Sequence, residues 1–209
     1  MPRSGRLSQP VESDERVASE LAEAGFAVLP DYLPEASWRA LGDEARRLRR
    51  GDAFRHAGVG RGASFRVAPE IRDDRVCWID PARPTRRQAA WLARMESLRR
   101  VLNRRLYLGL FGFEAHLAVY PPGARYARHL DRFADARHRL VSVLLYLNAD
   151  WQVEDGGALR LHLEAPAAPR DVLPLGGTLV AFLSGETPHE VLPAQRDRWS
   201  VVGWFTGRA

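Results

Sequence analysis

Three residues of this 209-residue chain have the types and spacing to bind a metal ion. The first two stand together as His129-Leu130-Asp131. On a β-strand, residues i and i+2 point to the same face, so this imidazole and this carboxylate can converge on one point. His189 follows a turn and begins a predicted late strand, 58 residues after Asp131. A second imidazole from a different strand would complete a set of three donors, so the spacing predicts a metal site.

A fourth residue, Arg198, indicates what else the site would bind. Two histidines and one carboxylate on one face of a metal leave three adjacent positions open, as in non-haem Fe(II) oxygenases. Arg198 stands nine residues after His189, at the start of the last predicted strand, and its planar fork suits bidentate binding of a carboxylate. Together these residues predict a 2-oxoglutarate site. The keto acid would bind iron through its 1-carboxylate and 2-oxo group, and Arg198 would hold its far carboxylate.

Other histidines and carboxylates offer weaker sites. In the ordinary alternative, the 129/131 couple is a solvated ion pair and His189 caps a turn. A second couple, His162-Leu163-Glu164, lies only 25 residues before His189, which leaves room for few intervening strands. We interpret it as an exposed strand end. Two further residues are interpreted as loop residues that flank the opening of the site: Asp135 and His138.

Three helices are predicted in the first half of the chain. Residues 1–12 resemble a flexible tail. The first helix is expected from Ser13 to a stop at Gly25, the second from Pro34, and the third from near Pro84 to about Arg105, each with apolar residues at helical spacing. Between them, residues 26–29 and 76–79 are typical of short strands, and residues 56–63, with three glycines, are typical of a mobile loop.

After Gly112 the period of the apolar residues changes to two. Residues 113–120 alternate as in a half-buried strand. Further short strands are expected near residues 126–130, 140–147, 158–163, 178–183, 190–192 and 198–205, with turn signals between them. Helices followed by many short strands predict a mainly β barrel or sandwich. We expect a single domain over 13–209, with a helical buttress over 13–110 and a β core over 111–209.

Composition excludes several classes of protein. Hydrophobic residues make up 45% and charged residues 27%, as in ordinary globular domains. No apolar run approaches the ~18 residues of a membrane span, and no signal sequence is visible. With Cys77 as the single cysteine, the expected location is the cytoplasm. All 31 basic residues are arginine, but the net charge is only +5, so codon composition is favoured over nucleic-acid binding as the explanation. Arginine clusters near residues 46–50 and 99–105 suit helix C-terminal ends.

Six segments of the chain follow one another in the order seen in a known enzyme family: Val76-Cys77-Trp78-Ile79-Asp80, Val119-Tyr120-Pro121-Pro122-Gly123, Tyr126-Ala127-Arg128-His129-Leu130-Asp131, Leu145-Tyr146-Leu147-Asn148-Ala149-Asp150-Trp151, Gly156-Gly157-Ala158-Leu159-Arg160 and Pro188-His189-Glu190-Val191. In these segments, and from about Phe26 onward, the sequence resembles the Fe(II)- and 2-oxoglutarate-dependent prolyl 4-hydroxylases, and most closely their oxygen-sensing type and its bacterial relatives. The resemblance implies a double-stranded β-helix, or jelly roll, packed on N-terminal helices, and hydroxylation of a prolyl residue in a protein or peptide.

The resemblance also implies a role for each matching residue. The iron ligands would be His129, Asp131 and His189, and Arg198 would bind 2-oxoglutarate. Arg196 is a rival with the same strand parity, but the nine-residue offset favours Arg198. The hydroxyl of Tyr146 would bond the far carboxylate of 2-oxoglutarate. Leu144 and Leu159 would form apolar walls of that pocket. Tyr120 and Tyr126 would be aromatic residues that line the iron site. Dioxygen would be the second co-substrate, and ascorbate an optional one.

Several alternatives stay open at this stage. The substrate could be a free amino acid or another small molecule, or the site could demethylate nucleic acid, and a third class is a non-catalytic jelly-roll binding module. The sequence departs from the family in the turn after Tyr120, which is one residue shorter. Residues 56–72 correspond to a loop that closes over substrate in the family, but they match it poorly. Neither the identity of the substrate nor the oligomeric state follows from the sequence.

Overall fold

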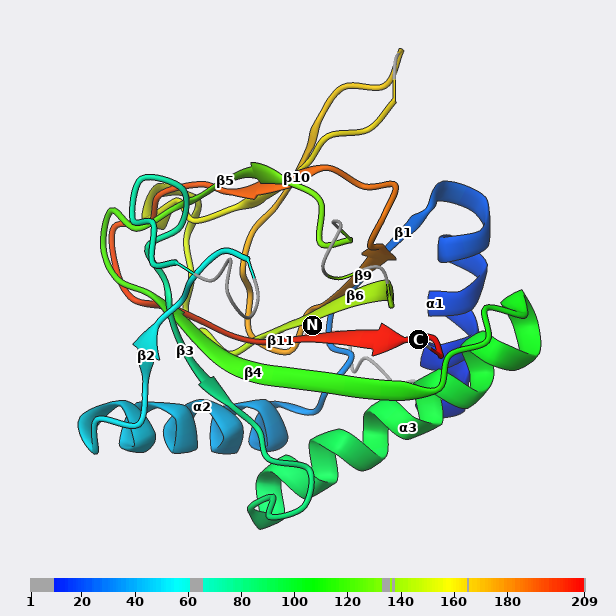
Figure 1. Ribbon diagram of the computed structural model, residues 1–209, viewed down its shortest axis with the longest axis horizontal. Helices are drawn as coiled ribbons and strands as arrows, with labels where there is room; N and C mark the ends of the chain where they lie inside the picture. The colour runs from blue at the N-terminus through cyan, green and yellow to red at the C-terminus, as the bar shows by residue number, and fades with distance from the viewer. Residues whose placement is uncertain (1–9, 61–65, 133–135, 137, 165, 209) are drawn as a thin grey trace, which may run out of the picture.

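Two antiparallel sheets and a set of helices make up the computed structural model, which describes residues 10–60, 66–132, 136, 138–164 and 166–208 (Figure 1). The α-helices of these residues are α1 (Pro10–Ala24), α2 (Glu35–Arg50) and α3 (Arg86–Leu106). Helix α1 begins before the predicted Ser13, so the last three residues of the predicted tail are helical, while residues 1–9 lie outside the described residues. No described helix has the length and apolar character needed to cross a membrane.

Local signals in the sequence explain the helix ends. Helix α1 stops at Gly25, whose φ of 74° is the left-handed conformation that glycine adopts at little cost. Helix α3 begins with a capping box, in which the Thr85 side chain accepts from the Gln88 backbone and the Gln88 side chain accepts from the Thr85 backbone. These bonds satisfy N–H groups that a helix leaves without partners at its first turn.

The larger sheet contains seven strands in the order β1-β9-β6-β11-β4-β3-β2, and the smaller contains four in the order β5-β10-β7-β8. Every neighbouring pair in both sheets is antiparallel. The strands are β1 (Phe26–Leu29), β2 (Arg55–His56), β3 (Arg75–Trp78), β4 (Gly112–Tyr120), β5 (Tyr126–His129), β6 (Arg139–Tyr146), β7 (Leu159–Leu161), β8 (Arg170–Val172), β9 (Leu179–Leu183), β10 (His189–Val191) and β11 (Arg198–Thr206). This architecture is a double-stranded β-helix, as expected.

Two apolar cores lie on the two faces of the larger sheet. Along β4, Leu117 and Val119 pack with the helices, whereas Ala118 and Tyr120 pack in the core between the two sheets. Figure 1 shows α2 and α3 beneath the larger sheet, and β5 and β10 above it. Strand β4 is therefore buried on both faces from Ala115 to Tyr120. The predicted half-buried alternation is wrong there, because a second sheet covers the face that the sequence assigned to solvent.

The N-terminal segment supplies strands as well as helices. Strand β1 closes one edge of the larger sheet beside β9, and β2 and β3 extend its other edge beside β4. Val59, in the predicted mobile loop, forms an antiparallel bridge with Arg66, which follows that loop. Residues 61–65 lie outside the described residues. Strands β2 and β8 were not predicted, because their sequences, Arg55-His56 and Arg170-Asp171-Val172, are both short and mostly polar. The division at residues 110/111 stays a prediction.

Candidate active site

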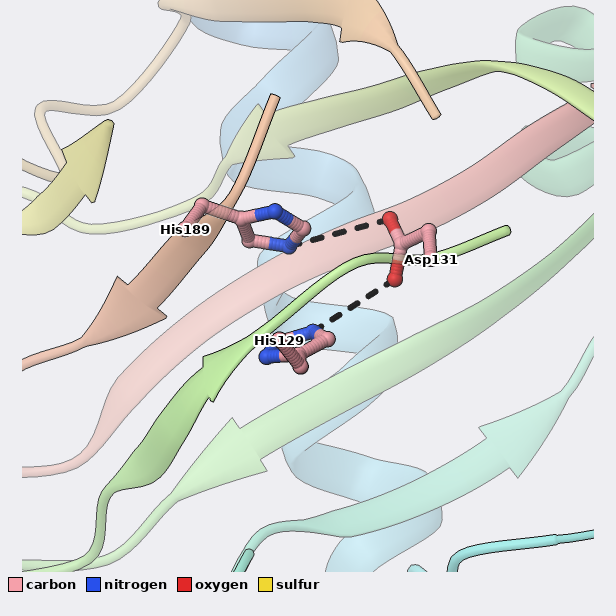
Figure 2. Close-up of side chains that lie close together, drawn as sticks. All are labelled: His129, Asp131 and His189. Carbon is pink, nitrogen blue, oxygen red and sulfur yellow. Dashed lines mark ion pairs between the residues drawn. The ribbon is translucent and has the colours of Figure 1, made fainter. Parts of the chain in front are cut away.

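The structure brings His129, Asp131 and His189 together between the two sheets (Figure 2). One potential ligand atom from each residue lies within 4.8 Å of the other two. The Nε2 atom of His129 lies 3.5 Å from Asp131 Oδ1, and Nε2 of His189 lies 3.7 Å from Asp131 Oδ2. The pairing of β5 with β10 sets His129 directly opposite His189. One nitrogen of each ring and the carboxylate can therefore face a single cation.

The backbone fixes which nitrogen of each imidazole faces the carboxylate. His129 Nδ1 lies 2.8 Å from the carbonyl oxygen of Ala127, and His189 Nδ1 lies 3.0 Å from that of Thr187. A carbonyl only accepts, so Nδ1 must carry the proton and donate it. The Nε2 lone pair is then left free for a metal, which is the usual outer support of a metal-binding histidine.

Asp131 is held as a carboxylate by its neighbours. Burial raises its pKa, but His189, His129 and the hydroxyl of Ser142 outweigh burial and hold the pKa of Asp131 well below its usual range. Ser142 Oγ donates to Asp131 Oδ2 at 2.6 Å and lies 2.8 Å from Ser184 Oγ. Burial is also the main reason why the pKa of His189 falls to about 4. The site therefore presents neutral imidazole and ionised carboxylate, the forms that bind metals.

Arg198 lies in the same cavity, completely buried. Its Nε donates to the carbonyl oxygen of Gly157 at 2.7 Å, but neither Nη1 nor Nη2 has a hydrogen-bond partner among the described residues. The Tyr146 hydroxyl is buried and likewise unpartnered, and the Arg198 guanidinium carbon lies 5.0 Å from the Tyr146 ring centroid. Burial raises the pKa of Tyr146, so this hydroxyl keeps its proton and can donate it.

Gly157 makes room for this arginine. A Cβ at this position would lie 3.2 Å from Arg198 Cδ and 2.9 Å from the Ala194 side chain, and the backbone φ of Gly157 is 68°. Any larger residue would be strained in this conformation and would also push against the arginine. The Gly157 carbonyl therefore accepts the hydrogen bond from Arg198 Nε, and Nη1 and Nη2 remain without a described partner.

The remaining residues predicted to line the site fall into two groups. Tyr126 stacks on His129 with ring centroids 3.5 Å apart, and the Tyr120 ring centroid lies 5.2 Å from the Arg198 guanidinium carbon. Both tyrosines border a cavity of about 1400 Å³ that also contains the 129/131/189 cluster. Its apolar walls include the other two predicted residues, Leu144 and Leu159.

The other residues considered as candidates do not belong to the cluster of His129, Asp131 and His189. Arg196 donates to the carbonyl oxygen of Ala149 at 2.6 Å and does not line the cavity. His162 Nε2 lies 3.0 Å from Glu190 and is only partly exposed, so the interpretation of that couple as an exposed strand end is too simple. His138 lies 3.8 Å from Glu114. Asp135 lies outside the described residues.

Several residues that line the cavity were not predicted from the sequence, among them His116, Trp78 and Trp204. His116 is almost fully buried, its Nδ1 has no described hydrogen-bond partner, and its ring lies between Trp78 and Trp204 at centroid distances of 4.9 and 5.4 Å. Burial, together with nearby Arg72 and other charges, lowers the pKa of His116 to about 3. The only sequence pattern that includes His116 is the alternation over residues 113–120, which assigned it to the solvent-facing side of the strand.

Comparisons with known proteins agree with this arrangement. The profile described as the 2OG-Fe(II) oxygenase superfamily matches residues 115–206. Egl nine homolog 1 of Homo sapiens is 32% identical over 187 residues, which cover 87% of this chain and 43% of that protein. The chain spans about half the length of the Egl nine homolog 1 proteins that it matches.

Two solved structures are similar over nearly the whole chain. A prolyl-4-hydroxylase of Pseudomonas putida is 46% identical with a TM-score of 0.83, covering 92% of this chain and 98% of that one. A prolyl hydroxylase of Trichoplax adhaerens, in complex with a hypoxia inducible factor peptide fragment, is 26% identical with a TM-score of 0.85, covering 99% and 94%.

The jelly roll, the histidine–aspartate–histidine cluster and the buried arginine define the class of the 2OG-Fe(II) oxygenases. The orphaned guanidinium and the nitrogen and oxygen donors fit the two groups that this class uses, Fe(II) and 2-oxoglutarate. The identity to the P. putida protein over almost its full length shows the narrower group. This chain belongs to the prolyl 4-hydroxylase type of the 2OG-Fe(II) oxygenase superfamily.

Proposed function

We propose that this protein is an Fe(II)- and 2-oxoglutarate-dependent dioxygenase that hydroxylates a prolyl residue in a protein or peptide, releasing succinate and carbon dioxide. The observation that carries the proposal is the buried guanidinium of Arg198, whose Nη1 and Nη2 are unpartnered in the cavity that also holds His129, Asp131 and His189. A metal site beside the unpaired, buried Arg198 guanidinium suits a ligand that carries a carboxylate at each end.

In this proposal, His129, Asp131 and His189 hold the iron. Two neutral Nε2 atoms and one carboxylate are donors of intermediate hardness, which suit Fe(II). All three side chains line the cavity, so further ligands could reach the iron from there. Ser142 and the carbonyls of Ala127 and Thr187 keep the three donors in position.

Arg198 and Tyr146 would bind the far carboxylate of 2-oxoglutarate. An unpaired charge in a dry interior is costly, and a carboxylate that accepts two parallel bonds from the guanidinium removes most of that cost. The Tyr146 hydroxyl can donate a third bond. Leu144 and Leu159 border the same cavity and would contact the methylene groups between the two ends of the co-substrate.

When bound, iron with 2-oxoglutarate and dioxygen supplies the oxidation that inserts one oxygen atom into a C–H bond. The residues of this chain supply position and a water-poor setting. Tyr126 stacks on His129, and Phe182 lies 4.5 Å from His189, centroid to centroid. These rings cover the imidazoles and hold them in one orientation, so the reacting atoms meet in a fixed geometry.

The prolyl substrate is proposed from the relatives. The P. putida and T. adhaerens proteins are both prolyl hydroxylases, and the second was solved with a peptide fragment. Half-exposed Trp78 lies at the cavity, where an extended peptide can reach it. We further propose a cytoplasmic location, supported by the lone cysteine Cys77. Ascorbate would serve only to keep the iron reduced.

The test is a turnover experiment with the whole protein. The enzyme is loaded with Fe(II) and 2-oxoglutarate without oxygen, then exposed to air with a pool of lysate peptides and, separately, with free amino acids and a methylated oligonucleotide. We expect a mass gain of one oxygen on proline within peptides, with equal amounts of succinate. Oxidation of the free amino acids or demethylation of the oligonucleotide instead, with unchanged peptides, would overturn the prolyl assignment. His129→Ala is the control that should form no succinate.

A further inference from the structure

The mouth of the active-site cavity is unusually basic. Besides Arg198, the cavity lining contains five arginines. Among the described residues that line the cavity, only Asp131 is acidic. The five are Arg55, Arg72, Arg128, Arg132 and Arg139. A substrate that enters this cavity therefore meets positive charge at its rim.

Three of these arginines already have partners within the protein. Arg55 lies 3.7 Å from Asp52 and donates to the carbonyl oxygen of Phe54 at 3.1 Å. Arg72 donates two hydrogen bonds, of 2.7 and 2.6 Å, to the buried carboxylate of Asp74. Arg139 donates to Glu114 at 2.7 Å and lies over the Trp204 ring. All three guanidinium groups therefore have partners within the protein.

Arg128 and Arg132 are different. Both are exposed, and neither side chain forms a hydrogen bond or an ion pair with any residue that the structure describes. They flank the cluster in the sequence, since Arg128 precedes His129 and Arg132 follows Asp131. Their charges thus stand on the cavity rim next to the predicted metal, free to meet a ligand.

We propose that Arg128 and Arg132 select peptides in which acidic residues flank the target proline, a substrate class that rests on the proposed prolyl hydroxylation. Carboxylates on an extended peptide would pair with the two guanidinium groups while the proline enters the cavity. Opposite charges at an exposed rim also steer the substrate toward its site. Exposed pairs are individually weak, so each is expected to change affinity about two- to fivefold.

Position favours a peptide over nucleic acid as the partner. Other arginines that could bind a phosphate backbone, such as Arg47, Arg50 and Arg104, lie at the ends of α2 and α3. Figure 1 places those helices beneath the larger sheet, whereas β5, which carries Arg128, lies above it. The basic residues therefore form separate groups, and the group at the mouth is small enough to match one or two carboxylates.

The experiment compares two peptides that differ only in charge. Both contain one proline, flanked by glutamates in the first and by glutamines in the second. Binding of the labelled peptides to the Mn(II)-loaded protein is measured first, and kcat/KM for hydroxylation second. We expect wild-type protein to favour the glutamate peptide about 5- to 20-fold in 50 mM salt, with most of the preference lost at about 0.5 M.

Two double variants assign the effect to residues. Arg128→Gln with Arg132→Gln should abolish the preference, so that the glutamate and glutamine peptides bind with equal affinity and are hydroxylated with equal kcat/KM. Arg47→Gln with Arg50→Gln removes the same charge from α2 and should keep the preference. Equal binding of both peptides to wild-type protein, or a preference that survives the first double variant, would overturn the proposal. So would a single-stranded oligonucleotide that binds through Arg128 and Arg132 more tightly than the glutamate peptide. Because binding is measured without turnover, a failure of prolyl hydroxylation would be seen separately.

Discussion

His129 and His189 face each other across the β5–β10 pair, with ring centroids 4.2 Å apart and ring planes inclined at 55°. Each ring donates from Nδ1 to the carbonyl oxygen two residues earlier in its own strand or turn. The same local hydrogen bond thus orients both imidazoles, although the two histidines are far apart in the sequence. Their Nε2 atoms lie 3.5 and 3.7 Å from the two carboxylate oxygens of Asp131.

Removing the hydroxyl of Ser142 should weaken metal binding. Ser142 holds one oxygen of Asp131 at 2.6 Å, so Ser142→Ala frees the carboxylate to rotate. Loss of such an outer partner typically lowers metal affinity by about 10- to 100-fold. Anaerobic titration with Fe(II) or Mn(II) measures the change. Ser200→Ala is the matched control, since Ser200 is buried on β11 and has no described hydrogen-bond partner; equal effects of the two variants would show that the Ser142 bond is irrelevant.

Arg198→Gln should raise the KM for 2-oxoglutarate by about 100-fold, because a buried charge pair and two charge-assisted hydrogen bonds are lost. Metal affinity measured without co-substrate should not change. Arg196→Gln is the matched control, because its guanidinium contacts Ala149 outside the cavity. If the Arg196 variant raised this KM and the Arg198 variant did not, the assignment of the two arginines would be reversed.

The Tyr146 hydroxyl should matter only when the co-substrate is present. In the free protein it is buried without a partner, so Tyr146→Phe should leave the free energy of unfolding unchanged or raise it slightly. The same variant should bind 2-oxoglutarate about 5- to 10-fold more weakly, since one neutral hydrogen bond is lost. Urea unfolding and calorimetric titration give the two numbers. A marked loss of stability with unchanged 2-oxoglutarate affinity would mean that Tyr146 is a packing residue.

His116 should make the metal-free protein sensitive to mild acid. In the unfolded chain its imidazole takes up a proton below about pH 6.5, whereas in the folded protein its pKa is about 3. The unfolded state therefore binds more protons in this window, and stability falls as the pH falls. Between pH 7 and 4.5 this one group accounts for about 2–3 kcal/mol.

The variant His116→Phe isolates that contribution. Its free energy of unfolding, measured with urea, should fall by about 2–3 kcal/mol less than that of wild type over the same pH range. His189 titrates in both proteins, so its effect cancels in the comparison. Parallel losses in the two proteins would contradict the buried neutral state of His116.

The closeness of His129 and Asp131 could be predicted from the sequence because it depends on local spacing. The period of a strand predicts that His129 and Asp131 lie on one side; β5 ends at His129, but the two side chains still lie together, with His129 Nε2 3.5 Å from Asp131 Oδ1. Strand parity could not separate Arg196 from Arg198, since parity holds only within a strand and β11 begins at Arg198. Arg196 lies just before β11, and its side chain donates to the Ala149 carbonyl outside the cavity.

Other features depend on contacts that no pattern in the chain reveals. His116 alternates with apolar residues along β4 and resembles a solvent-facing position. Only the second sheet, built from segments far along the chain, turns that face into the cavity wall. Ser142, between apolar residues of β6, resembles a neutral core position, yet it supports Asp131. The short strand β8, Arg170–Val172, is too polar and too short to give a periodic signal.

The most direct test of the account is a crystal structure of the protein soaked with Mn(II) and 2-oxoglutarate without oxygen. We expect one anomalous peak within coordination distance of His129 Nε2, His189 Nε2 and an Asp131 carboxylate oxygen, with the far carboxylate of the co-substrate on Arg198. A fully occupied metal bound elsewhere, or a peak that excludes any one of the three side chains, would contradict it.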